Sequence, residues 1–234
     1  MQEYNPREVM DCYNRTAKEY AEQFLNELDV KPFDRNILNR FSDTLPEGSQ
    51  IYDFGCGSGQ TTKYIHDKNR HKIIGLDFSE NAVQLAKQNF PEMEFIVDDM
   101  LNSKMTSGSA DGILAFYAVV HFTYIEIEQT LKEWLRLLKP KAISLFSFHV
   151  GEEWVEVVDF LGVRGANAAW HLLNPDKVLE IAERVGFKVE EAVIRYPYQG
   201  QEHESKRAYI ILRKAGNMQS KNLMDEQQSR PTTR

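Results

Sequence analysis

Apolar and polar positions along the 234-residue chain alternate between stretches of helical spacing and short apolar runs. Near the N-terminus, apolar residues recur at every third or fourth position, which predicts helices over 6–28 and 32–42. After residue 49, apolar runs predict strands, and segments of helical spacing separate them. The expected strands are 50–54, 72–77, 94–97, 111–116, 142–148, 188–195 and 207–212, and the expected helices between them are 59–68, 80–89, 125–138 and 174–185.

The regular alternation of apolar strands and helices is typical of a mainly parallel sheet with helices on both faces. The predicted fold class is therefore α/β. Two helices have a clear start, because Ser79 and Asn174 stand where an N-cap side chain accepts from the first backbone N–H groups. The last two strands are joined by a loop without a helix, so we expect them to be antiparallel neighbours at one side of the sheet.

The composition and charge of the chain narrow the class of protein. Hydrophobic residues make up 42% of the sequence, enough for a substantial core, and the formal net charge of -7 argues against unspecific phosphate contacts with nucleic acid. No apolar run approaches the roughly 18 residues that a membrane span needs. Two cysteines are too few for a disulfide framework, and the N-terminal segment lacks an apolar secretory stretch. We expect a cytoplasmic protein without a membrane or nucleic-acid partner.

A glycine-rich turn joins the strand at 50–54 to the next helix, in the segment IYDFGCGSGQ. Gly55, Gly57 and Gly59 allow a tight turn and let a ligand approach bare backbone N–H groups. Dinucleotide-binding and phosphate-binding turns share this pattern. Gln60 stands where the dinucleotide pattern has its third glycine, and no Lys-Ser or Lys-Thr pair follows, so both of these interpretations are disfavoured.

Carboxylates stand at the ends of three successive predicted strands. Asp53 precedes the glycine turn, where it would repel a pyrophosphate but attract an ammonium group. Asp77 ends the second strand, where its two oxygens can accept from both hydroxyls of a ribose. Asp99 follows the third strand, where it can accept from an exocyclic amine. Each acid alone would also suit a solvated turn, but together they fit a ligand with an α-amino acid end, a free ribose and an adenine.

With these motifs in this order, the chain from Tyr13 to Leu212 resembles a class I S-adenosylmethionine-dependent methyltransferase of the small-molecule type. The resemblance implies a Rossmann-like, doubly wound sheet of seven strands in the order 3-2-1-4-5-7-6, with strand 7 antiparallel and helices on both faces. It also implies S-adenosyl-L-methionine as the cofactor.

The residues that match the cofactor motifs of this family lie in a few short segments. Asp53 and the glycine turn match the motif that contacts the methionine portion of the cofactor, with Cys56 in a variable position of the turn. Asp77 matches the ribose-binding acid, and Phe78 the residue beside the adenine. Tyr13 loosely resembles a residue that covers the cofactor, although its spacing suits a packed helix face equally well. The expected set is Tyr13, Asp53, Gly55, Cys56, Gly57, Gly59, Asp77, Phe78, Asp99, Met100 and Phe116.

The segment AFYAVVHF after the fourth strand matches the part of the family that passes under the sulfonium and faces the methyl acceptor. The reaction implied is in-line methyl transfer to an O, N, S or C nucleophile, for which the protein mainly orients the acceptor. A base is needed only where the acceptor must lose a proton. His121 is the first candidate, with Tyr117 and His149 behind it. A hydrogen-bonded structural role for His121 stays open.

The chain is expected to divide into three parts. Helices within 1–45 form part of a lid, 46–214 form the methyltransferase domain, and 215–234 form a flexible tail with almost no apolar anchor. An insert at about 150–174 is expected to cover the acceptor. Its aromatic residues suit plain packing equally well, and they are Trp154, Phe160, Trp170 and His171.

The expected methyl acceptor is a small molecule. A base-modifying nucleic-acid enzyme would carry an Asn-Pro-Pro-Tyr type of signature after strand four, or a Pro-Cys nucleophile, and this sequence has neither. A non-catalytic S-adenosylmethionine-binding subunit or sensor stays open, because cofactor motifs say nothing about turnover. Less favoured alternatives are a protein or nucleic-acid methyltransferase and a nicotinamide oxidoreductase. No pair of His or Cys residues has the spacing of metal ligands, so no metal site is expected.

Overall fold

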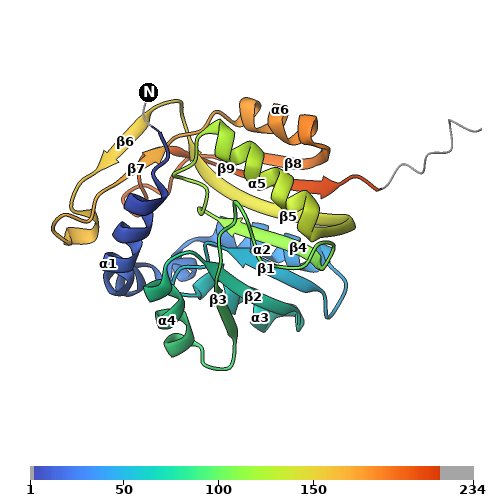
Figure 1. The fold of residues 1–234 in the computed structure, drawn as a ribbon, viewed down its shortest axis with the longest axis horizontal. Helices are drawn as coiled ribbons and strands as arrows, with labels where there is room; N and C mark the ends of the chain where they lie inside the picture. Colours follow the sequence, from blue (N-terminus) through green and yellow to red (C-terminus); the bar gives the residue numbers. More distant parts are fainter. Residues whose placement is uncertain (1–2, 217–234) are drawn as a thin grey trace, which may run out of the picture.

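The structure, a computed structural model, describes residues 3–216. Its centre is a seven-stranded sheet in the order β3-β2-β1-β4-β5-β9-β8 (Figure 1). Neighbouring strands from β3 to β5 pair in parallel, whereas β9 runs antiparallel to both β5 and β8. The strands are β1 Gln50–Phe54, β2 Lys72–Asp77, β3 Glu94–Val97, β4 Ala110–Phe116, β5 Leu138–Val150, β8 Phe187–Arg195 and β9 Lys206–Lys214. The predicted order is confirmed, since β8 and β9 are the sixth and seventh strands of this sheet along the chain.

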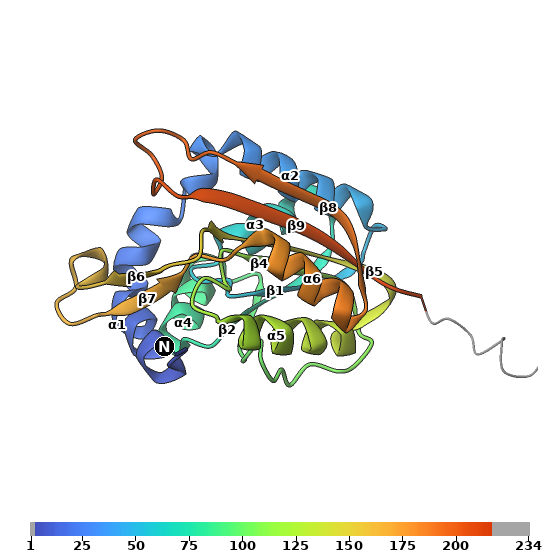
Figure 2. The same ribbon diagram turned by 90° about the horizontal axis from the view of Figure 1, so that it is seen from above.

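Helices cover both faces of the sheet, as the alternation predicts (Figure 2). Side chains of β5 point alternately to the two sides, which is the period of a strand. Ile143 and Leu145 pack in the core with α2 and α3, whereas Phe146 and Phe148 pack in the core with α5 and α6. The helices are α1 Pro6–Phe24, α2 Pro32–Thr44, α3 Gln60–Asn69, α4 Glu80–Asn89, α5 Tyr124–Leu137 and α6 Pro175–Val185.

The ends of the elements follow local chemistry. Both predicted N-caps are confirmed, because the Ser79 side chain accepts from the Ala82 N–H and the Asn174 side chain from the Asp176 N–H. The first helix ends at Phe24, not at 28, and a separate 3₁₀ turn, η1 Glu27–Val30, follows it. Lys31 precedes a proline, which disfavours helical backbone there, so the chain leaves one helix before it enters the next.

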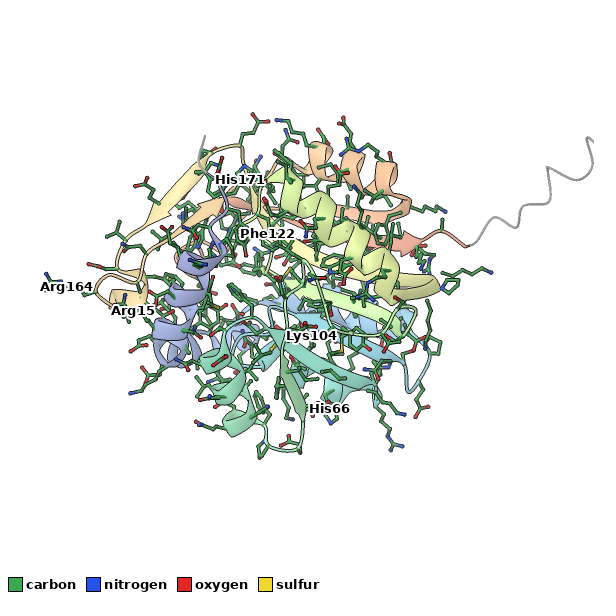
Figure 3. The ribbon with its side chains drawn as sticks, viewed as in Figure 1. Arg15, His66, Lys104, Phe122, Arg164 and His171 are labelled. Carbon is green, nitrogen blue, oxygen red and sulfur yellow. The ribbon has the colours of Figure 1, made fainter. Side chains whose placement is uncertain are left out.

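The insert after β5 forms a small antiparallel hairpin that the sequence pattern did not predict. Its strands are β6 Trp154–Val157 and β7 Ala168–His171, with the short turn η2 Phe160–Gly162 between them. Four-residue strands are too short for a periodicity to stand out. The hairpin lies beside α1 (Figures 1 and 2). Arg15 of α1 donates to the carbonyls of Arg164 and Gly165 in the hairpin loop, where Figure 3 places Arg15 next to Arg164.

Three further expectations concern the C-terminal tail, membrane-spanning helices and the two cysteines. Apart from its first two positions, the predicted tail at 215–234 lies outside the described residues. Within residues 3–216, no helix combines the length and apolar character that crossing a membrane requires. Cys12 and Cys56 are both buried, unpaired thiols.

Candidate active site

Two adjoining cavities lie at the carboxyl ends of the central strands, where α1 covers the sheet. They share five lining residues: Tyr13 and Tyr20 from α1, Gly55 after β1, and Phe116 and Tyr117 at the end of β4. The second cavity has a volume of about 550 Å³. Ligands of open α/β sheets bind at this edge, where the strand order reverses between β1 and β4.

All but one of the predicted site residues line these cavities. The first cavity is lined by Tyr13, Gly55, Gly57, Asp77, Phe78, Asp99, Met100, Phe116, Tyr117 and His121. The second cavity is lined by Tyr13, Asp53, Gly55, Cys56, Phe116, Tyr117 and His149. Gly59 lines neither of them. It has a φ of 90° at the start of α3, and a Cβ there would stand 2.9 Å from Phe95 Cζ, so it serves the packing of the turn.

The glycine turn is closed by Asp77. Its two carboxylate oxygens accept from the backbone N–H groups of Gly57 and Ser79, each at 2.9 Å. Burial raises the pKa of Asp77, and these N–H groups oppose that rise. Each carboxylate oxygen can accept a second hydrogen bond, so the predicted ribose contact is compatible with this geometry. Asp77 thus has a structural role that the sequence pattern did not indicate.

Asp77→Asn is expected to weaken both folding and cofactor binding. An amide nitrogen cannot accept from a backbone N–H, so one hydrogen bond to a charged group is lost, at a cost of about 1–3 kcal/mol. Urea unfolding measures the stability, and calorimetry with S-adenosylhomocysteine measures affinity. Asp67→Asn is the matched control, because Asp67 is an exposed acid at the end of α3 away from both cavities. Unchanged affinity in Asp77→Asn would contradict the ribose assignment.

The other two predicted acids occupy different surroundings. Asp53 is 1% exposed and accepts from the Thr62 hydroxyl at 2.6 Å, and burial raises its pKa to about 7. Asp99 is exposed and accepts from the Leu101 N–H. The neighbouring Asp98 is buried and accepts from Ser103. Asp98 therefore holds the loop, and Asp99 is left at the rim of the first cavity.

His121 is hydrogen-bonded through both ring nitrogens. Its Nδ1 lies 2.8 Å from the Ala169 carbonyl, and its Nε2 lies 3.0 Å from the Tyr13 hydroxyl. A carbonyl only accepts, so Nδ1 carries the proton and Nε2 accepts from Tyr13. Burial lowers the pKa of His121 to about 4. His121 lies in the segment after β4, and its side chain links this segment to α1 and to β7. These contacts favour the structural role that the sequence left open. His171 in the same hairpin similarly donates to the Phe122 carbonyl (Figure 3).

Tyr117 begins a chain of hydrogen bonds that leads away from the cavities. Its hydroxyl lies 2.7 Å from the Tyr209 hydroxyl, which donates to Asp34 Oδ1 at 2.7 Å. Because the Tyr209 proton goes to Asp34, Tyr117 donates to Tyr209 and keeps its own lone pairs free. Arg195 donates to both Tyr209 and Asp34. The Tyr117 backbone has a φ of 55°, and its N–H donates to the Ser147 hydroxyl.

His149, the third candidate base, stacks on Trp170 with ring centroids 5.8 Å apart and planes 10° apart. Its Nδ1 lies 2.8 Å from the Ser205 hydroxyl. Burial and the charges of Arg207, His203 and Lys31 lower the pKa of His149 to about 3. At neutral pH this imidazole is therefore uncharged and weakly basic.

Sequence reasoning missed several residues of the second cavity and its surroundings. Asp34 stands in the first turn of α2, where an acid is ordinary, and Tyr209 alternates with apolar residues of β9 as a core residue would. Their contact joins positions 175 apart in the chain. No local pattern marks such a pair. In the sequence, the loop 196–207 suits either the rim of a pocket or a surface pair of Glu204 with Arg207; in the structure Arg207 is 3% exposed and lines the second cavity.

Comparisons with known proteins agree with this geometry. Residues 51–141 match the model of a family described as a methyltransferase domain. A demethylmenaquinone methyltransferase from Thermotoga maritima is 24% identical over 212 residues, which cover 78% of this chain and 89% of that protein. A tRNA (carboxymethyluridine(34)-5-O)-methyltransferase from Mus musculus is 30% identical over 144 residues, which cover 61% of this chain and only 20% of that protein. A solved S-adenosylmethionine-dependent methyltransferase from Methanosarcina mazei has a TM-score of 0.67 at 17% identity, covering 76% of this chain and 97% of that one.

The sheet order, the glycine turn and the matched family together define a class I S-adenosylmethionine-dependent methyltransferase. The chain belongs to this class of enzyme, and its cofactor is S-adenosyl-L-methionine. The donor set fits that cofactor: Asp53, Asp77 and Asp99 border the cavities, and within residues 3–216 none of them is paired with a Lys or Arg. Carboxylates without a cationic partner can bind the ammonium group of the cofactor and accept hydrogen bonds from its hydroxyl and amine groups. In the same part of the chain, no group of three or more His, Cys, Asp or Glu side chains is arranged to hold a metal ion.

Proposed function

We propose that this enzyme methylates a small molecule bound in the second cavity, with the cofactor seated mainly in the first. The observation that carries the proposal is the pair of cavities that share Phe116 and Tyr117. A shared wall is where a methyl donor and its acceptor would meet. The name of the Thermotoga maritima relative supports a small-molecule acceptor, and the match to that relative covers most of its length.

The cofactor-binding roles follow from the chemistry of each side chain. Asp53 binds the ammonium group of the methionine portion, Asp77 binds the ribose, and Asp99 binds the adenine amine. The S-adenosyl-L-methionine methyl group is already activated by its positively charged sulfur. Phe116 and Tyr117 stabilise positive charge through their ring faces by about 0.5–2 kcal/mol. The remaining task of the protein is to orient the acceptor and exclude water.

Tyr117 is the best placed of the three candidate bases for an acceptor that must lose a proton. Its oxygen can accept the acceptor proton while its own proton moves to Tyr209 and the Tyr209 proton moves to Asp34. Asp34 is fully buried, and within residues 3–216 its Oδ2 has no hydrogen-bond partner. His121 instead has both ring nitrogens engaged, so we assign it the positioning of α1.

The N-terminal helices and the hairpin are proposed to form the lid over the two cavities. Tyr13 and Tyr20 of α1 line both cavities, and Phe160 and Trp170 of the insert line the second. Arg15 joins α1 to the hairpin loop, and His121 joins both to the segment after β4. Excluding water in this way prevents hydrolysis of the donor, which would consume its methyl group without transfer to the acceptor.

The direct test is incubation of the purified protein with methyl-labelled cofactor and a metabolite extract. Labelled product that depends on Asp53 and Asp77 supports the proposal. Tight cofactor binding with no transfer under any condition would favour the sensor alternative. Preferential binding of NAD in equilibrium dialysis would favour the oxidoreductase alternative.

Cofactor affinity is expected to rise with pH up to about 7 and then level off. Asp53 must be ionised to bind an ammonium group, and its pKa in the ligand-free fold is about 7, so each pH unit below that value reduces affinity by up to about tenfold. Since the folded pKa is raised above the unfolded value of 3.8, the same carboxylate makes the ligand-free fold less stable as pH rises from about 4 to 7.

Calorimetry with S-adenosylhomocysteine between pH 5.5 and 8 would measure this dependence, and buffers of different ionisation enthalpy would detect the released proton. Asp53→Asn is expected to bind weakly with a flat profile, whereas Asp77→Asn keeps the slope. A slope that survives in Asp53→Asn would contradict the assignment of the ammonium group to Asp53.

A further inference from the structure

The second cavity contains a group of nitrogen-rich side chains that the cofactor roles leave unused. His149 lies near the end of β5, His203 lies in the loop before β9, and Arg207 lies near the start of β9. The rings of His149 and His203 are 5.8 Å apart, and Trp170 borders both of them. Residues from three separate segments thus converge on one wall of the cavity.

Arg207 is a buried cation with unused hydrogen-bonding capacity. It is 3% exposed, and its Nη1 donates to the carbonyls of His203 and Ser205. Its Nε is ion-paired with Glu202 Oε1 at 3.5 Å but makes no hydrogen bond within the described residues. A buried donor on a charged group that makes no hydrogen bond is costly. Such a donor at a cavity wall points to a ligand acceptor.

Of the three acids that line the same cavity, Asp53 is assigned to the cofactor, and Glu202 and Glu27 are already engaged with other groups. Glu202 accepts from Arg195 at 2.7 and 2.8 Å and from the Tyr198 N–H. Glu27 pairs with Lys31 and accepts from Gln60. Neither carboxylate fully satisfies Arg207. Burial is the largest cause of the lowered pKa of His149, and the charges of Arg207, His203 and Lys31 lower it further against the opposing effect of Glu202.

We propose that the methyl acceptor carries an oxyanion group, a carboxylate or a phosphate, which is held by Arg207, His149 and His203. A guanidinium N–H and imidazole N–H groups are good donors to such oxygens. Trp170 would lie against the carbon part of the acceptor beside this group. The proposal rests on the proposed function, since it describes what the second cavity holds during methyl transfer.

The test uses three probes of similar size: benzoate, phenyl phosphate and the uncharged benzamide. Each is titrated into the full-length protein saturated with S-adenosylhomocysteine, and tryptophan fluorescence is followed because Trp170 lines the cavity. At least one of the two anions is expected to bind about tenfold or more tightly than benzamide, in keeping with charged hydrogen bonds. The stronger of the two anions then identifies the chemistry of the acceptor.

Arg207→Gln is expected to abolish this preference, and Arg207→Lys to retain part of it. Arg213→Gln is the matched control, because Arg213 stands on the same strand but pairs with Glu190 at the surface. It is expected to bind the anions as the wild type does. Retained affinity for S-adenosylhomocysteine shows that each variant is folded, and His203→Ala is the second variant should Arg207→Gln fail to fold.

Three results would overturn the assignment. Equal binding of benzoate, phenyl phosphate and benzamide would contradict the proposal that the acceptor carries an oxyanion group. Anion binding that occurs only in the protein without S-adenosylhomocysteine, and is displaced when that ligand is added, would assign the positive wall to the carboxylate of the cofactor itself. An anion preference that survives in Arg207→Gln would place the anion elsewhere. Failure of the wild type to bind S-adenosylhomocysteine would count against the proposed function, which separates the two claims.

Discussion

Tyr117→Phe is expected to lower the rate of methyl transfer to a protic acceptor by about 10²–10⁴-fold, the usual contribution of a positioned acid or base. The phenylalanine ring keeps the cavity wall and its contact with positive charge. It removes the oxygen that receives the acceptor proton and the donor to Tyr209. Affinity for S-adenosylhomocysteine is therefore expected to stay near the wild-type value.

Single-turnover rates with methyl-labelled cofactor, together with calorimetry, separate these two effects. Asp34→Asn is expected to reduce the rate similarly, because the chain of hydrogen bonds ends at Asp34. Tyr64→Phe is the matched control, since the Tyr64 hydroxyl donates to Asn39 away from both cavities. A Tyr117→Phe enzyme that turns over normally at every pH would eliminate the phenol as the base.

Gly55→Ala is expected to destabilise the fold by about 2–5 kcal/mol and to abolish cofactor binding. The φ of 68° at Gly55 costs an alanine about 1–2 kcal/mol. A Cβ would stand 2.3 Å from Ala118 Cβ, and forcing apart such a packed contact adds about 1–3 kcal/mol. The displaced segment carries Tyr117, so both cavities change shape.

The control for this variant is Gly48→Ala. Gly48 has a similar φ of 76° but has nothing within 4 Å of the added Cβ, so only the backbone cost of about 1–2 kcal/mol is expected. Urea unfolding of the two variants measures the difference, which isolates the contact with Ala118. Equal losses of stability in the two variants would show that the turn can relax around the methyl group.

Prediction from the sequence succeeded where the information is local. The bounds of β1, β2, β3 and α4 agree residue by residue with the expected ones, because a glycine turn follows β1, the Ser79 cap stands between β2 and α4, and two aspartates follow β3. The glycine turn and the acids at strand ends are likewise local signals. A parallel sheet brings consecutive strand ends to one edge, which is why these distant residues could be expected to meet.

The failures concern contacts between distant segments. In the sequence, Asp34 has the pattern of an ordinary acid in the first turn of a helix, and Tyr209 has that of a core residue of a strand. Their contact becomes visible only when α2 packs against β9. Arg207 carries no sign in the sequence that it is buried beside His149. Whether the predicted site residues bind the cofactor stays a prediction, although all but Gly59 line the cavities.

The left-handed backbone of Tyr117 has a consequence for how this enzyme can change. A non-glycine residue in that region costs about 1–2 kcal/mol, and glycine or asparagine would relieve it. Either replacement would also remove the ring contacts of Tyr117 with Phe116, His149 and Tyr209, and the loss of a packed aromatic side chain costs about 3–5 kcal/mol. A directed-evolution campaign on this scaffold is therefore expected to keep an aromatic side chain at position 117 in spite of its backbone strain.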